Sequence, residues 1–106
     1  MDEGQKNDFK KTDIFEAWLE GLDNTPRGRI IRRIKKAEGG NFGDCETIEG
    51  GVIEIKLHFG PGYRLYCYRA GVDQYLLLVG GDKSTQAGDA TRARAIKREL
   101  EGSGKW

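Results

Sequence analysis

The sequence predicts an α+β fold: a helical hairpin, then a small antiparallel sheet, then a final helix. Apolar residues recur at helical spacing before residue 40 and again from Ala90 to Leu100, whereas the stretch from Val52 to Val79 has the patterning of strands. Helices and strands that do not alternate along a chain are typical of α+β proteins. The length of 106 residues suits one domain, residues 1–106.

The first helix is predicted to open at Thr12 or Asp13, with Glu16 completing a capping box. Its apolar stripe consists of Ile14, Phe15, Trp18, Leu19 and Leu22. The second helix opens at Asn24, a capping residue followed two positions later by a proline, and two glycines at 39–40 end it. Its stripe consists of Ile30, Ile31, Ile34 and Ala37. The short link between the two helices predicts a hairpin.

Three strands are predicted after a loop over residues 41–51. In the first strand, Ile53, Ile55 and Leu57 alternate with Glu54, Lys56 and His58. A turn over residues 59–62 leads to a second strand, Tyr63 to Arg69, and a nearly continuous apolar run from Gln74 to Val79 predicts a central third strand. The last helix is predicted to begin near Asp89, and residues 101–106 are predicted to form a flexible tail.

One face of this sheet is predicted to carry the helices and the other to be open. Lys56, His58, Arg64 and Tyr66 would lie together on the open face, since antiparallel neighbours bring side chains of one face within reach of each other. Two cations beside a histidine suit phosphate binding with proton transfer. On an open face, Arg64 is expected to contribute little to stability.

The charge distribution predicts one strongly basic surface. The formal net charge is only +1, yet six cations and no acid fall between residues 27 and 36: Arg27, Arg29, Arg32, Arg33, Lys35 and Lys36. This run is a solvated face, a polyanion footprint or a docking face for an acidic peptide. Neither a membrane span nor a signal peptide is visible, which predicts a cytoplasmic protein, and two cysteines with one histidine argue against structural zinc. No cofactor is expected, because the glycines and Lys83 of residues 80–85 lack P-loop spacing.

Several motifs, in this order along the chain, resemble the HigB-like killer proteins of toxin–antitoxin modules, in the RelE/ParE superfamily. They are Phe15-x-x-Trp18-Leu19-x-x-Leu22, Arg29-Ile30, Asn41-x-Gly43-Asp44, Ile55-Lys56-Leu57, Gly62-Tyr63-Arg64-Leu65 and Gly80 to Gln86. The resemblance spans Phe15 to Leu100. It implies an additional first strand, which the polar residues 1–11 specify poorly and which is therefore expected to be short or frayed.

The resemblance also implies a function: a metal-independent endoribonuclease that cleaves messenger RNA on the ribosome and is held inactive by a small helix-turn-helix antitoxin. The implied catalytic residues are Lys56, His58, Arg64 and Lys83, and the residues for RNA or antitoxin binding are Arg29, Arg32, Arg33, Lys36, Tyr66 and Gln86. The tyrosine that RelE-like relatives often carry near the last helix is missing from residues 86–89. Two alternatives stay open, namely a ParE-like inhibitor of DNA gyrase and a non-catalytic RNA-binding or protein-binding module.

In such a nuclease the ribose 2′-hydroxyl attacks the adjacent phosphorus, so the enzyme must neutralise the phosphate and move two protons. Arg64 and Lys83 suit the first task. Lys56 or His58 suits the second, because histidine is the side chain that ordinarily changes charge near neutral pH.

Overall fold

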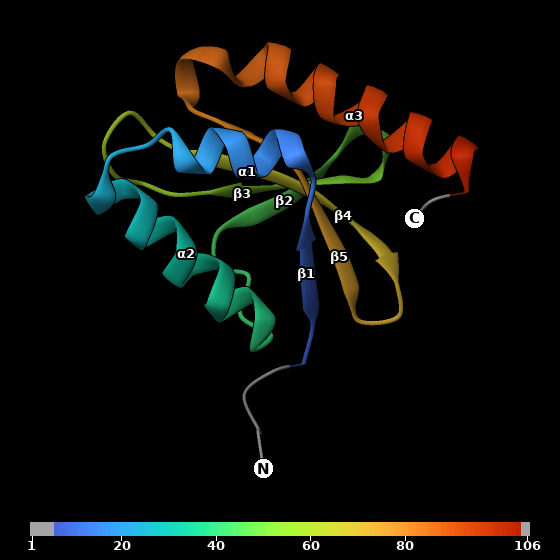
Figure 1. Cartoon of the computed structure of the whole chain (residues 1–106), viewed down its shortest axis with the longest axis horizontal. Coiled ribbons are helices and arrows are strands. Elements are labelled where there is room, and N and C mark those ends of the chain that lie inside the picture. Colours follow the sequence, from blue (N-terminus) through green and yellow to red (C-terminus); the bar gives the residue numbers. More distant parts are fainter. Residues whose placement is uncertain (1–5, 105–106) are drawn as a thin grey trace.

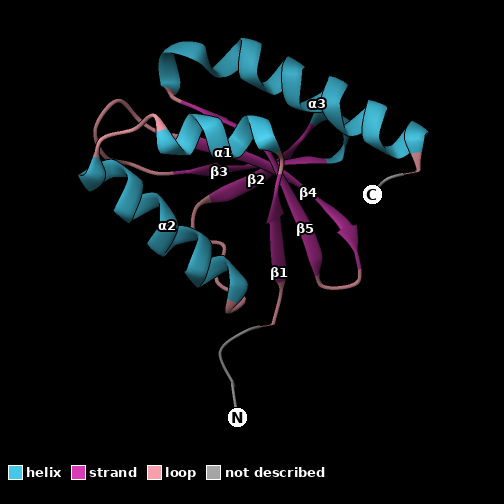
Figure 2. Cartoon of the chain, in the orientation of Figure 1, coloured by secondary structure: helices cyan, strands magenta, loops and turns pink. Residues whose placement is uncertain are grey.

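The computed structural model describes residues 6–104 and has an α+β architecture, as the sequence predicts. A five-stranded sheet has the order β1-β5-β4-β3-β2. The strands are β1 (Asp8–Lys11), β2 (Cys45–Ile48), β3 (Val52–Lys56), β4 (Arg64–Gly71) and β5 (Gln74–Gly81), and the helices are α1 (Asp13–Glu20), α2 (Asn24–Glu38) and α3 (Gln86–Ser103). All neighbouring strands are antiparallel except β1, which runs parallel to β5 (Figure 2).

Helices lie on both sides of the sheet, so the prediction of an open face is wrong. The helices α1 and α2 pack against one face, and α3 runs across the other (Figure 1). The first core contains Phe15, Leu19, Ile30 and Ile34 with Ile55, Leu65 and Leu77 of the sheet; the second contains Val52, Tyr66, Tyr68, Leu76 and Leu78 with Ala93 of α3. The β5 strand is buried on both faces and lies between β1 and β4, in agreement with its apolar run.

Local sequence explains how the first helix begins and how closely it approaches the sheet. The Thr12 hydroxyl caps α1 by accepting a hydrogen bond from the backbone N–H of Phe15 at 3.0 Å, and it also donates to the carbonyl of Leu78 at 2.7 Å. Gly80 lies directly against Trp18 of α1, where any β-carbon would overlap the indole ring. A glycine at this point of β5 therefore allows α1 to pack close to the strand.

Several boundaries differ from those predicted, and β4 and β5 each extend two residues further than expected. Residues 45–48 form the edge strand β2 rather than a loop, paired with β3 from Cys45 opposite Ile55 to Ile48 opposite Val52. The last helix begins at Gln86 and extends to Ser103, so the tail predicted from Glu101 starts in the helix, and its final residues 105–106 lie outside the described part of the chain. The short first strand forms over Asp8–Lys11. Residues 1–5, which were also considered for this strand, lie outside the described part of the chain. None of the helices within residues 6–104 is long and apolar enough to cross a bilayer.

Candidate functional site

Neighbouring ends of β3 and β4, and the turn after β5, carry three of the predicted catalytic cations. Lys56, the last residue of β3, pairs in register with Arg64, the first residue of β4, and Arg64 pairs with Gly81 at the end of β5. Lys83 follows two residues later and lies against Gly62, as does a terminal nitrogen of Arg64. The Lys83 backbone N–H donates to the Pro61 carbonyl at 3.4 Å, which joins the two loops. We call Lys56, Arg64 and Lys83 the strand-end cluster.

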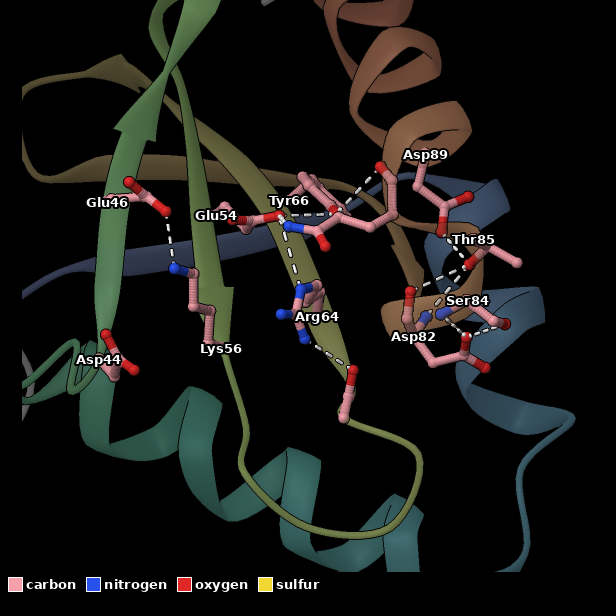
Figure 3. Close-up of polar contacts among 12 residues, drawn as sticks. Asp44, Glu46, Glu54, Lys56, Arg64, Tyr66, Asp82, Ser84, Thr85 and Asp89 are labelled. Atoms are coloured by element: carbon pink, nitrogen blue, oxygen red, sulfur yellow. Dashed lines mark hydrogen bonds and ion pairs between the residues drawn. The ribbon is translucent and has the colours of Figure 1, made fainter.

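Arg64 is buried rather than exposed, with only 9 % of its surface accessible. Its Nη1 donates to the Gly62 carbonyl at 2.9 Å, and its Nε lies 3.8 Å from Oε2 of Glu54, which is 2 % accessible (Figure 3). The same Glu54 oxygen accepts hydrogen bonds from the Tyr66 hydroxyl at 2.9 Å and from Nε2 of Gln86 at 3.0 Å. The Glu54 carboxylate therefore ties Arg64 to the beginning of α3.

Tyr66 belongs to this buried network and is fully inaccessible, so its predicted role in contacting RNA or antitoxin is wrong. The physical reason is that α3 covers the sheet face on which it lies. Burial and the hydrogen bond to Glu54 raise the pKa of the Tyr66 hydroxyl, which keeps it a donor. Gln86 is half-buried beside Tyr66 and donates a hydrogen bond to the same Glu54 carboxylate.

Lys56 points away from Arg64 toward the edge strand, where its ammonium lies 2.6 Å from the carboxylate of Glu46 (Figure 3). This hydrogen bond raises the pKa of Lys56 above the ordinary value of 10.5. Lys56 is therefore a stable cation at neutral pH and suits donating a proton better than accepting one.

His58 lies two residues past the end of β3, and the charges of both His58 and Lys56 act on the Asp44 carboxylate. Its exposed imidazole contacts the Asp44 carboxylate through Nε2, and this hydrogen bond lowers the pKa of Asp44. A carboxylate on one ring nitrogen orients an imidazole and leaves the other nitrogen available for proton transfer. Sequence reasoning did not assign Asp44 to the site, although its motif with Asn41 and Gly43 marks this turn.

The predicted cations of α2 line a separate hollow of about 400 Å³. We call it the α2 groove; its lining residues are Arg29, Arg32, Arg33, Lys36, Leu57, His58 and Phe59. The four cations recur at positions i, i+3, i+4 and i+7, which places them on one side of the helix. His58 thus belongs to this groove, whereas Lys56, Arg64 and Lys83 do not line it.

The four α2 cations differ in what they contact. Arg33 donates to the carbonyls of Phe42, at 3.1 and 3.3 Å, and of Asp44, at 3.1 Å, so it fixes the 41–44 loop to the helix. The guanidinium of Arg29 lies over the Phe59 ring, 3.8 Å from its centroid. The side chains of Arg32 and Lys36 make no hydrogen bond or ion pair with any residue of the described chain. Among residues 6–104, no three His, Cys, Asp or Glu side chains gather as a metal site.

Comparison with known proteins agrees with the motifs and the fold. Residues 17–101 match the family described as phage-derived protein Gp49-like (DUF891). The chain is also 39 % identical over 93 residues to an uncharacterized protein of Haemophilus influenzae, an alignment that covers 87 % of this chain and 94 % of the relative. A match of this extent includes every strand except β1 and all of α2, together with both parts of the site. The chain therefore belongs to the Gp49-like family (DUF891), a RelE/ParE-like toxin family of toxin–antitoxin modules.

Proposed function

We propose that this protein is the toxin of a type II toxin–antitoxin module and, like the HigB-like killer proteins, a metal-independent endoribonuclease. It cleaves messenger RNA on the ribosome and thereby inhibits translation. Family membership supports the toxin role and a cognate antitoxin as partner. The observation that supports the nuclease assignment is the strand-end cluster, because Lys56, Arg64 and Lys83 come from three adjacent strand ends. In the proposed complex these cations surround one phosphate of the RNA.

In the proposed reaction, the ribose 2′-oxygen forms a bond to phosphorus while the bond from phosphorus to the 5′-oxygen breaks. The products are a 2′,3′-cyclic phosphate and a free 5′-hydroxyl. His58, oriented by Asp44, accepts the 2′-hydroxyl proton, and Lys56 donates a proton to the departing 5′-oxygen. Arg64 and Lys83 stabilise the charge that develops on the phosphate.

The test is induction of the gene for this protein, with growth, translation and DNA supercoiling followed together. We expect growth arrest with loss of translation and messenger fragments that end in 2′,3′-cyclic phosphate. Co-expression of a neighbouring helix-turn-helix protein should restore growth. Replacement Lys83→Gln should abolish the arrest, whereas Lys35→Gln, which also changes an exposed lysine, should not.

Other outcomes separate the alternatives. Loss of supercoiling with intact messenger RNA would identify a ParE-like gyrase inhibitor. Harmless accumulation of folded protein would contradict a toxin role and leave a binding module as the function.

A further inference from the structure

The α2 groove has the composition of a nucleic-acid site rather than a peptide site. Its lining consists of four cations, one histidine and one aromatic ring, with Leu57 as the single aliphatic residue, and Leu57 is buried. A groove for an amphipathic peptide presents aliphatic pockets instead. Single-stranded RNA, in contrast, is held by cations along its backbone and by flat groups against its bases.

The flat group in this groove is the guanidinium of Arg29, supported by Phe59. Phe59 is half-buried and packs at a tilt against Tyr63, with a centroid distance of 5.3 Å, so the Tyr63 ring supports the Phe59 ring. Arg29 lies over the Phe59 ring and is itself exposed to solvent. Its guanidinium donates no hydrogen bond to any described residue of the chain, which leaves both its outer face and its donors available.

We propose that the α2 groove binds a single-stranded segment of RNA, with one base stacked on the Arg29 guanidinium over Phe59 and the adjoining phosphates on Arg32 and Lys36. Arginine planes stack on unpaired bases, and the stack accepts any base because each has a π-face. Arg32 and Lys36 lie one and two turns further along α2, about 5 and 10 Å from Arg29 along the helix axis. Arg33 is not among the phosphate ligands, since its donors hold the 41–44 loop.

This inference rests on the proposed function and names the part of the substrate that the groove holds. The strand-end cluster acts on the reacting phosphate, and the α2 groove holds unpaired nucleotides beside it. His58 lines the groove and follows Lys56 by two residues, so one RNA strand passes from the groove to the cluster along the end of β3.

The experiment measures equilibrium binding of a 2′-O-methylated single-stranded oligoribonucleotide, which cannot be cleaved by 2′-oxygen attack, to the whole protein at several salt concentrations. A 2-aminopurine in the oligonucleotide reports stacking by its fluorescence. Phe59→Leu and Arg29→Lys should each weaken binding roughly 5- to 100-fold, the range for loss of one stacked base, and should reduce the quenching. The double variant should be little weaker than either single one, because both changes remove the same stack.

Arg32→Gln and Lys36→Gln should act differently from the stacking variants. Each should lower the slope of log affinity against log salt by about 0.7, the value for one phosphate contact on a single strand, with quenching retained. Lys35→Gln is the matched control on the same helix; it lines a different hollow and should leave binding unchanged. Thermal melting of every variant tests whether the fold is intact, and Arg29→Lys keeps the test valid if Phe59→Leu unfolds.

Unchanged affinity and quenching in both stacking variants would overturn the inference. Binding of an acidic peptide to the groove, with no binding of RNA, would also overturn it. Preference for duplex RNA over single strands would also overturn it. These failures differ from failure of the proposed function. If RNA binds through the stack but messenger RNA on the ribosome is never cleaved, the nuclease proposal is rejected. If messenger RNA on the ribosome is cleaved and the Phe59→Leu variant binds RNA as the wild type does, only the groove proposal is rejected.

Discussion

Arg64 lies where a buried carboxylate meets the proposed phosphate site, so its removal affects both stability and reaction. Arg64→Ala leaves Glu54, which is 2 % accessible, without its ion-pair partner. We expect the variant to lose about 1 to 3 kcal/mol of unfolding free energy, the cost of leaving a buried polar group unsatisfied. Urea denaturation measures this loss. Arg69→Ala, an exposed arginine of the same strand, is the control and should change stability little.

The double variant Glu54→Gln/Arg64→Ala identifies the cause of that loss. Because glutamine removes the orphaned charge, the double variant should recover part of the stability of Arg64→Ala. Equal stability of Arg64→Ala and Arg69→Ala would show that the Glu54 contact contributes nothing. The same result would agree with the sequence-based expectation that this arginine contributes little to stability.

At the scale of elements, the turn between β5 and α3 positions Lys83 by means of Asp82. The Oδ1 atom of Asp82 accepts hydrogen bonds from the Ser84 backbone N–H at 2.8 Å and from the Ser84 hydroxyl at 2.5 Å. The bond from Ser84 lowers the pKa of Asp82 below its ordinary 3.8. A lowered folded-state pKa means that the carboxylate stabilises the fold above the unfolded value and that this contribution is lost as pH falls through the folded value.

Asp82 caps the short 3₁₀ helix Lys83–Thr85. We therefore predict that Asp82→Ala costs about 1 kcal/mol at neutral pH, as loss of a helix cap does, and that its difference from wild type shrinks below about pH 4. Urea denaturation at neutral and acidic pH gives both values. Asp82→Asn should lose less at neutral pH, because asparagine also caps helices. A difference from wild type that is constant across this range would show that the charge of Asp82 has no part in the cap.

The elements that the sequence predicts well are those with a long, one-sided apolar pattern, such as α2 and β5. The sequence does not predict the strand β2, because only four of its residues pair with β3 and two of these are exposed. Glycines also lie in the sequence on both sides of the strand. The side on which α3 packs could not be predicted either. The apolar stripe of α3, formed by alanines with Ile96 and Leu100, predicts a helix that packs on the sheet. The stripe does not indicate which face of the sheet the helix covers.

That uncertainty explains which neighbour relations among the candidate residues can be predicted from the sequence. Lys56 and Arg64 were expected to be neighbours, and they are, because register follows from the hairpin turn alone. The burial of Arg64 and Tyr66, and their contacts with Glu54, depend on α3, which is distant in sequence. The contact of His58 with Asp44 depends on β2 and was unpredictable for the same reason.

At the scale of the whole molecule, a formal net charge of +1 conceals two different cationic regions. The α2 groove contains two cations with no acidic partner among residues 6–104, Arg32 and Lys36, which attract a polyanion at a distance. In the strand-end cluster, Lys56 and Arg64 each form an ion pair with a glutamate. The glutamate fixes the position of the cation and neutralises part of its charge. Binding and reaction are therefore expected to depend on different residues.

The last prediction separates these two tasks in one cleavage assay on ribosome-bound message. Arg32→Gln/Lys36→Gln should raise the protein concentration needed for half-maximal rate, most strongly at high salt, and leave the single-turnover rate at saturation unchanged. Lys56→Gln should lower the saturating rate about 100-fold or more, as loss of a general acid does, with little change in binding. Because the pKa of Lys56 is raised above 10.5 by Glu46, the wild-type rate should not fall through loss of this proton between about pH 6 and pH 9. Thermal melts of both variants should match wild type, since the Lys56 ion pair is partly exposed and such pairs contribute little to stability. If the Lys56→Gln defect appears only in binding, the lysine is a phosphate contact and the proton for the leaving oxygen comes from another group.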